Sequence, residues 1–500
     1  METQDPNASQ IQPVPLGGVE IAPPPTDTSL PQETFVVPAS QADPVNPFIP
    51  NIQMPASAPP KPAGGLGAGL KRLFIIGAII AVIALVFVLV RSFASNARAA
   101  KEATITYWGL WENDATLRSI IADFETKNPK IKVQYIKQSP KQYRERVQSA
   151  INRGEGPDIF RFHNTWVSML RNQLALVPPT IMTPAEFTSA FFPVIANDLI
   201  AGQSIFGLPL MIDGLGLYIN DDLFATAGVT PPTSWTEVLN MVPRLTVKNG
   251  STIVTSAIAL GTATNVEHFS DILALMFLQN GASLTKLVGK EAEETLTFYK
   301  KFADPSDPLF TWNDSMDNSV AAFASGRVAM ILAPSWRAHD IKVISPNLRF
   351  KIVPVPQLLG NSVAWASYWV EGVSSKSTYQ TQSWEFLKYL TSAEVVSKLY
   401  TEQSKTRLFG EPYARVELAN TITDDPFVGA YVKQALFARS FPLASRTFDN
   451  GLNDKLIKYL EDAVNGMATN APSKVLETAS AGFRQVLSTY GLISAAAPTP

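Results

Sequence analysis

Hydrophobic positions after residue 103 follow two alternating patterns, short apolar runs and longer amphipathic segments. Runs at Ala103–Tyr107, Ile131–Ile136 and Ile352–Val355 have the length and apolar character of strands buried in a sheet. Segments at Thr116–Thr126 and Gln142–Arg153 repeat their apolar residues every three or four positions, as one face of a helix does. Strands that alternate with helices in this way predict an α/β fold.

A different pattern precedes these segments, because every residue from Leu73 to Val90 is apolar or glycine. A helix of this length spans roughly 27 Å, close to the hydrocarbon thickness of a bilayer, so we predict a transmembrane anchor over 71–93. A cleaved signal peptide is the alternative, since Ala97-Arg98-Ala99 offers a small-residue cleavage pattern. The long preceding tail and the length of the run favour the anchor. Basic residues flank both ends of the run, so charge alone does not set its orientation.

The first 66 residues contain fifteen of the 38 prolines and a single basic residue, Lys61. Their apolar residues show no helical or strand period that could build a core. This composition predicts a disordered, proline-rich tail over 1–70 that acts as a tether. A recognition segment is the alternative, but no PxxP repeat with a basic flank marks one.

Composition and charge argue against several kinds of partner and site. Its 500 residues carry a net charge of -2 and include no cysteine. The charge does not favour nucleic acid as a partner, and the missing cysteines exclude disulfides and thiolate metal sites. The histidines, His163, His268 and His339, lie far apart in the sequence, so we expect no metal centre. Without a nucleotide-binding or metalloprotease motif, we also expect no cofactor.

Short motifs occur along the chain in one particular order. They are Ile105–Trp111, Gly154–Ile159, Phe206–Pro209, Leu217–Phe224, Pro231–Glu237, Phe323–Met330 with Trp336, Trp384–Ser392 and Leu460–Leu487. In this order they resemble family 1 extracellular solute-binding proteins of ABC importers, the family that includes maltose-binding protein. Each motif is weak by itself, and their shared order along the chain carries the resemblance.

The resemblance implies a type II periplasmic-binding-protein-like fold behind the N-terminal transmembrane helix. In this fold two α/β lobes are joined by strands that cross between them, and the ligand is enclosed by hinge closure. We therefore expect the solute-binding domain over 103–490. Its first lobe is expected to comprise about 103–210 and 368–415, and its second lobe about 216–362 and 420–490.

The resemblance also implies a solute-binding component of an ABC importer, which captures a small ligand, a carbohydrate, for the permease subunits. The binding domain would then lie outside the cytoplasm, held at the cell membrane by the N-terminal helix. Two alternatives stay open, a ligand-sensing surface receptor with the same fold and an anchored glycan-processing enzyme. Possible carboxylates for an enzyme are Glu112, Asp213, Glu267 and Glu371. Because the family binds without turnover, we expect no enzyme activity and no catalytic residue.

A sugar presents apolar C–H faces and a rim of hydroxyls, so its site needs flat aromatic rings and a few fixed hydrogen-bond partners. Trp336 matches the position of a sugar-stacking tryptophan in maltose-binding relatives, with core packing as the alternative. Asp213 lies where those relatives carry a ligand-facing carboxylate. For Asp213 the alternative is a hinge residue that caps the turn at Gly214.

Further candidates lie near predicted strand ends, where such folds bind ligands. They are Trp108, Trp111, Glu112, Asn164, Trp166 and Trp369. Core packing or a satisfied loop side chain is the alternative for these residues. The family's ligand contacts are not reproduced in register around Asn164, which argues against maltose itself. Arg407 lies where relatives often carry a Pro-Thr/Arg motif, changed here to Lys405-Thr406-Arg407, and we interpret it as a solvated charge. Phe448 lies near the family's final aromatic contact, and Trp235 and Trp384 are predicted to be core.

Overall fold

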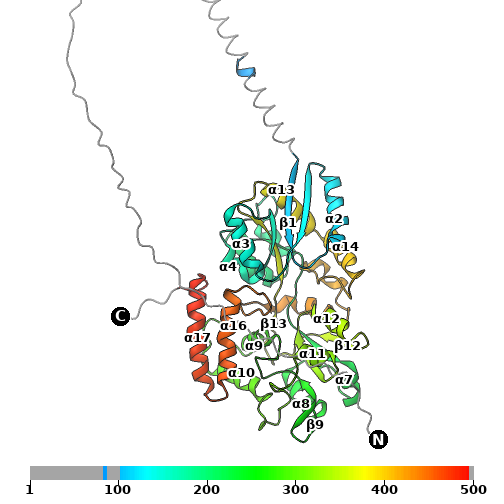
Figure 1. Ribbon diagram of the computed structural model, residues 1–500, viewed down its shortest axis with the longest axis vertical. Helices are drawn as coiled ribbons and strands as arrows, with labels where there is room; N and C mark the ends of the chain where they lie inside the picture. Colours follow the sequence, from blue (N-terminus) through cyan, green and yellow to red (C-terminus); the bar gives the residue numbers. More distant parts are fainter. Residues whose placement is uncertain (1–82, 87–101, 495–500) are drawn as a thin grey trace, which may run out of the picture. The chain divides into compact units, whose positions relative to one another are not determined.

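The computed structural model describes residues 83–86 and 102–494 (Figure 1). Of the predicted anchor, only 83–86 is described, as one helical turn, and the predicted tail over 1–70 lies outside the described residues. Within the two described ranges, no helix is both long and apolar enough to cross a membrane. The anchor over 71–93 stays a prediction from the sequence.

The first sheet contains six strands in the order β2-β1-β3-β14-β4, with β7 paired to β14. They are β1 (Ala103–Gly109), β2 (Ile131–Lys137), β3 (Ile159–His163), β4 (Leu174–Ala175), β7 (Leu208–Pro209) and β14 (Trp369–Ser374). β1 runs parallel to β2 and β3, whereas β14 runs antiparallel to β3, β4 and β7. This sheet therefore combines strands from two distant stretches of the chain.

Helices pack around the first sheet, as Figure 1 shows for α2, α3, α4, α13 and α14. Their bounds and those of the neighbouring helices are α2 (Asp114–Lys127), α3 (Tyr143–Arg153), α4 (Val167–Leu170), α5 (Pro184–Ala190), α6 (Pro193–Leu199), α13 (Gln380–Leu390) and α14 (Ala393–Ser404). α2 buries Leu117, Ile120 and Phe124, the spacing of one helical face. The amide of Asn128 binds the carbonyl of Phe124, and Pro129 cannot continue the helix. The helices predicted near 116–126 and 142–153 are thus confirmed.

The second sheet contains five strands in the order β12-β8-β11-β10-β9. They are β8 (Gly216–Asn220), β9 (Val247–Asn249), β10 (Thr252–Ile258), β11 (Val328–Ala333) and β12 (Phe350–Val353). The helices of this region are α7 (Asp221–Ala227), α8 (Trp235–Leu245), α9 (Phe269–Gln279), α10 (Lys290–Lys301), α11 (Ser319–Ala324), α12 (Arg337–Ile344), α15 (Gly429–Gln434), α16 (Leu452–Gly466) and α17 (Pro472–Thr489). Two sheets with helices around them give the α/β architecture, while the predicted lobe boundaries stay a proposal.

One predicted strand is shifted along the sequence. The apolar run at Ile352–Val355 predicts a strand over those residues. The strand in the structure, β12, instead covers Phe350–Val353 and pairs with β8 along this length. Proline has no backbone N–H group to donate to a strand ladder, so Pro354 stops the pairing. The strand therefore extends towards its N-terminus instead.

Three chain segments lie side by side between the two sheets, and we call them the crossing segments. The first, 210–215, connects β7 to β8; the second, 364–368, contains β13 (Ala364–Trp365) and leads into β14; the third, 405–415, follows α14. Backbone bridges join Gly214 to Ala366 and Met211 to Tyr413. A Cβ atom on Gly214 would lie 1.8 Å from the carbonyl oxygen of Trp365, so only glycine fits here.

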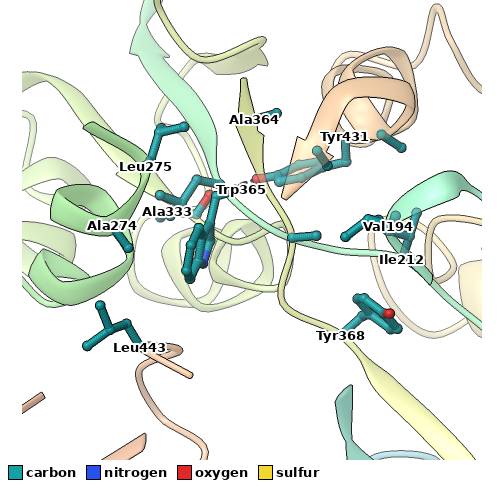
Figure 2. Close-up of a cluster of buried hydrophobic side chains, with 14 of the residues drawn as sticks. Val194, Ile212, Ala274, Leu275, Ala333, Ala364, Trp365, Tyr368, Tyr431 and Leu443 are labelled. Atoms are coloured by element: carbon teal, nitrogen blue, oxygen red, sulfur yellow. Dashed lines mark hydrogen bonds between the residues drawn. The ribbon is translucent and has the colours of Figure 1, made fainter. Parts of the chain in front are cut away.

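The crossing segments are packed as part of the hydrophobic core (Figure 2). Figure 2 shows Trp365 and Tyr368 on one continuous segment, with α9 to one side and Val194 and Ile212 to the other. The indole Nε1 of Trp365 donates a 2.9 Å hydrogen bond to Asp271 of α9. Since these side chains are fully enclosed, the connection between the two sheets is a packed structure with defined contacts.

Candidate ligand-binding site

A cavity of about 460 Å³ opens beside the crossing segments, and its lining comes from strands of the first sheet and from the loop and helix that follow β11 of the second sheet. Trp111 follows β1 and Trp369 begins β14, whereas Trp336 lies between β11 and α12. Asp213 reaches the same cavity from the first crossing segment. The volume is in the range of small-molecule sites. The structure therefore brings together four residues that the sequence predicts as ligand contacts.

Trp369 is held by ring contacts on several sides. Its ring centroid lies 5.6 Å from that of Trp111 and 5.2 Å from that of Trp166, in edge-to-face arrangements. The imidazole of His163 is a third edge-to-face neighbour at 5.1 Å. Such contacts fix the orientation of an aromatic ring. Trp111 keeps 37% of its surface exposed, so it remains accessible to a ligand.

Trp336 lies on the opposite side of the cavity, immediately before α12. The guanidinium carbon of Arg337 lies 3.9 Å from its ring centroid, and His268 contacts it edge to face at 5.9 Å. Arg337 is itself paired with Glu267 and Asp340. The ring is therefore positioned by a charged network, while 39% of the residue surface stays exposed. Part of this indole is available to a ligand.

Asp213 combines a place in the cavity lining with a structural role in the first crossing segment. Its Oδ1 accepts hydrogen bonds from the backbone N–H groups of Gly214 and Ser335 at 2.8 and 3.0 Å, and its Oδ2 accepts from the Ser335 hydroxyl at 2.8 Å. Burial raises the pKa of the Asp213 carboxyl to about 6, against the effect of these donors. The carboxylate thus ties the crossing segment to the loop that carries Trp336.

A buried ion triad lies behind the two tryptophans of the first sheet. Arg161 Nη1 is 2.9 Å from both carboxylate oxygens of Glu112, and its Nε is 2.6 Å from Glu371 Oε1. Burial raises the pKa of Glu371, whereas at Glu112 burial is outweighed by the charge of Arg161 together with hydrogen bonds and the charge of Arg407, so the pKa is lowered. Because Glu112 follows Trp111 and Glu371 lies two residues after Trp369, the triad fixes the backbone of both lining tryptophans.

Four predicted site residues lie behind the lining of the cavity. Glu112 belongs to the ion triad, and Asn164 is buried with hydrogen bonds to two protein neighbours. Trp166 is 1% exposed and supports Trp369 from behind, and Trp108 is half-buried against the core. The sequence locates the strand ends where such residues occur. It does not reveal which side of each loop faces the cavity, because that depends on contacts with distant segments.

Other lining residues come from segments that the sequence analysis did not place in the site. They include His268, Arg407, Phe409, Glu411, Arg446 and Thr447. The interpretation of Arg407 as a solvated charge is wrong, because its side chain is only 28% exposed and lines the cavity. Positions 407, 409 and 411 lie in bends and irregular backbone of the third crossing segment, where the strand period of two does not apply, so no local pattern identifies them from the sequence. Phe448, which also lines the cavity, was noted from the sequence.

Comparison with known proteins places the chain in a family. A family model described as bacterial extracellular solute-binding protein matches residues 108–397. The matched region begins in β1 and ends in α14, so it includes both sheets. It also contains four of the lining residues described above, Trp111, Asp213, Trp336 and Trp369.

Individual relatives agree with this match. The chain is 25% identical over 325 residues to the multiple sugar-binding protein of Streptococcus mutans, covering 62% of this chain and 76% of the relative. It is 21% identical over 276 residues to a putative binding protein of Brucella abortus, covering 53% and 66% of the two chains. Both alignments extend over more than half of each protein.

Solved structures with the same fold include two maltose-binding-type proteins. A cyclo/maltodextrin-binding protein complexed with maltotetraose aligns with a TM-score of 0.61 at 17% identity, covering 77% of this chain and 97% of that one. The maltose-binding periplasmic protein of Listeria monocytogenes in complex with maltose gives 0.62 at 19% identity, covering 78% and 98%. The chain therefore has the two-lobe α/β fold and belongs to the family of bacterial extracellular solute-binding proteins.

Proposed function

We propose that this protein captures a carbohydrate in the cavity between its lobes and delivers it to the permease of an ABC importer. The observation that carries the proposal is the convergence of three tryptophans, Trp111, Trp336 and Trp369, on one cavity with Asp213. Aromatic rings pack against the C–H faces of a sugar, and polar groups beside them accept its hydroxyl hydrogen bonds. The name of the streptococcal relative and the maltotetraose and maltose in two similar structures support this ligand class.

Closure of the two lobes on the ligand is the expected mechanism of capture. The cavity takes lining residues from the first sheet and from the loop and helix after β11, so a ligand gains its full set of contacts only when the lobes are together. A ligand shifts an equilibrium by its differential affinity for the two states, and contacts from both lobes supply that difference. The three crossing segments form the hinge in this proposal, and the permease would recognise the closed form.

Contacts of the carboxylates near the cavity favour binding over catalysis. Glycoside hydrolysis requires two carboxyl groups that face the scissile bond. Of the four carboxylates considered for an enzyme, Glu112 and Glu371 are bound to Arg161 in the buried triad and Glu267 is paired with Arg337 and Arg446. Among these four, Asp213 alone lines the cavity, so they do not supply a pair. Ligand capture without chemical change fits this arrangement better.

A thermal-shift screen tests the proposed function. Full-length protein in detergent is heated with a panel of neutral and charged mono- and oligosaccharides, with amino acids and short peptides as the contrasting panel. A sugar present at 100 times its dissociation constant should add about 2.7 kcal/mol to the free energy of unfolding. A shift with peptides or amino acids and with no sugar would contradict the proposal.

The sequence supports a membrane-anchored form of this binding protein. In this part of the proposal residues 71–93 cross the membrane, residues 1–70 lie in the cytoplasm, and the domain from 103 onward lies outside. Protease added to intact cells should therefore digest the binding domain and leave a protected N-terminal fragment. Loss of the tail with a spared domain would show the opposite orientation. A soluble product that begins near Ala100 would show signal-peptide cleavage instead.

A further inference from the structure

One segment of the chain, residues 445–453, runs along the cavity and ends in the first turn of α16, and we call it the strap. It follows the short strand β15 (Ala438–Arg439), and its first four residues, 445–448, line the cavity. α16 packs against α9, and α17 packs against α10, both helices of the second sheet (Figure 1). The strap is therefore carried by the part of the molecule around the second sheet.

The first half of the strap is attached where α9 begins. The backbone amide of Ser445 donates a 3.0 Å hydrogen bond to Oδ2 of Asp271, and the Ser445 hydroxyl lies 2.7 Å from Nδ1 of His268. Arg446 forms an ion pair with Glu267, directly before the helix. These contacts join the strap again to the second-sheet part of the molecule.

The second half of the strap contacts α3, a helix of the first sheet. Arg144 Nε of α3 donates a 2.5 Å hydrogen bond to the backbone carbonyl oxygen of Asp449. Asn450 Nδ2 donates a 2.9 Å hydrogen bond to Oε1 of Glu145, the next residue of α3. The strap thus connects the two parts of the molecule beside the cavity.

Two more contacts extend this connection into the start of α16. Asn453 Nδ2 donates a 2.7 Å hydrogen bond to Oγ1 of Thr165, which lies in the 3-10 helix η1 (Asn164–Trp166) directly after β3. The backbone amide of Leu452 lies 3.5 Å from the sulfur of Met169 in α4. Because α16 is packed on α9, these contacts also join the two parts. Separation of the parts would break all four of these contacts.

The backbone of the strap has an unfavourable conformation that its surroundings maintain. Within the described residues four non-glycine residues have a clearly positive φ, and three of them are in the strap: Arg446 at 62°, Phe448 at 52° and Asn450 at 45°. Side chains disfavour this left-handed region, so it persists where surrounding contacts fix the chain. Asp449 is fully buried, and its carboxylate accepts hydrogen bonds from three backbone N–H groups at the start of α16.

We propose that the strap is a latch: its contacts with α3, η1 and α4 hold the two lobes together before a ligand is bound, and they break when the cavity opens. This inference rests on the hinge closure in the proposed function and adds a contribution to closure from the protein itself. A ligand then acts on an equilibrium that already favours the closed form. The closed population sets the apparent affinity, and opening of the latch limits the rate of ligand entry.

A distance measurement on the ligand-free protein tests the latch directly. The chain contains no cysteine, so two introduced cysteines are the only sites for spin labels. Lys141→Cys lies next to the lining residue Pro140, and Val343→Cys lies on α12, one turn after the lining residue Asp340. Both positions are exposed, on opposite sides of the cavity. Electron paramagnetic resonance on the full-length protein in detergent should show mainly one short distance.

Two variants weaken the latch without changing the cavity lining. Arg144→Ala removes a hydrogen bond from a charged donor, so the ratio of open to closed molecules should rise about tenfold. Asn450→Asp keeps the size of the side chain and its tolerance of a positive φ but places a second carboxylate against Glu145. Since like charges in contact repel, the ratio should rise at least about threefold.

Asn470→Asp is the matched control for the charge change. Asn470 is exposed beyond the other end of α16, and its side chain is bound to Gly466 and Thr469. This variant should leave the distance distribution of the ligand-free protein unchanged. Melting temperatures close to that of the wild type would confirm that all three variants are folded.

Binding kinetics provide a second readout with any sugar that the thermal-shift screen identifies. Arg144→Ala and Asn450→Asp should bind it at least about threefold more weakly, because fewer molecules are closed. They should also associate with it faster, because the cavity is open more often. Loss of a direct ligand contact would weaken binding without faster association and without a longer distance in the ligand-free protein.

The outcomes separate the latch from the proposed function. A ligand-free wild type that is mainly open, or a distance distribution that neither variant changes, would show that the strap is no latch, while sugar binding would still support the proposed function. Weaker binding with an unchanged distance and association rate would likewise overturn the latch. Longer distances in the two variants, with no sugar bound by the wild type, would support the latch and contradict the proposed function.

Discussion

Arg161→Ala is expected to lower the free energy of unfolding by about 3–5 kcal/mol, a large part of the roughly 5–15 kcal/mol by which native proteins are usually stable. Arg161 is fully buried and forms ion pairs with both Glu112 and Glu371. Removing it leaves two buried carboxyl groups that repel one another and that water does not reach. Chemical denaturation of the full-length protein, followed by circular dichroism, measures the loss.

Two controls show whether the loss has this cause. Arg349→Ala removes an exposed arginine from an ion pair with Asp222, and it should leave the free energy of unfolding almost unchanged. The loss in Arg161→Ala should shrink as the pH falls towards 4, because the orphaned carboxyl groups have raised pKa values and take up protons in the folded state before the unfolded chain does. A loss that does not change with pH would mean that packing, and not charge, explains the effect.

Trp336→Ala should weaken ligand binding at least about tenfold, once a ligand is found, with little change in the unfolding midpoint. An aromatic contact contributes about 0.5–1.5 kcal/mol beyond its buried area, and about 1.4 kcal/mol is a tenfold change in affinity. The indole lines the cavity and is 39% exposed, so its removal leaves no cavity in the core. Calorimetric titration and thermal unfolding on the same preparation give the two values.

Trp384→Ala provides the contrasting control. Trp384 is 1% exposed within α13, so its truncation should cost about 3–5 kcal/mol of stability while the folded fraction keeps its ligand affinity. If instead Trp336→Ala lowered the midpoint by many degrees and left affinity intact, Trp336 would belong to the core. The ligand contacts would then have to be sought at Trp111 and Trp369.

The spacing of apolar residues in the sequence was sufficient to predict individual helices and strands. The apolar spacing of Leu117, Ile120 and Phe124 predicts α2, because a helix that covers a sheet must bury one face. The end of β12 was misplaced because the hydrophobic pattern continues through Val355, although Pro354 cannot pair. The order of motifs gave the fold class, which no single element could supply.

The site was harder to predict because it depends on contacts between distant segments. Trp111, Trp336, Trp369 and Asp213 meet at one cavity because each follows or begins a predicted strand or crossing. Arg407 meets them only through the third crossing segment, whose path no local pattern specifies. Whether these residues contact ligand stays a prediction.

The strand order of the first sheet has a consequence for how the chain folds during synthesis and export. β14 lies between β3 and β4 in space, but it follows all the strands of the second sheet in the sequence. The second sheet uses one uninterrupted stretch, 216–353, and can pair its strands as soon as that stretch has emerged. The first sheet must wait with an open central position, its edges exposed to other chains. The sheet that is begun first is thus completed last, and until residues 369–374 are made its strand edges stay open to pairing with other chains.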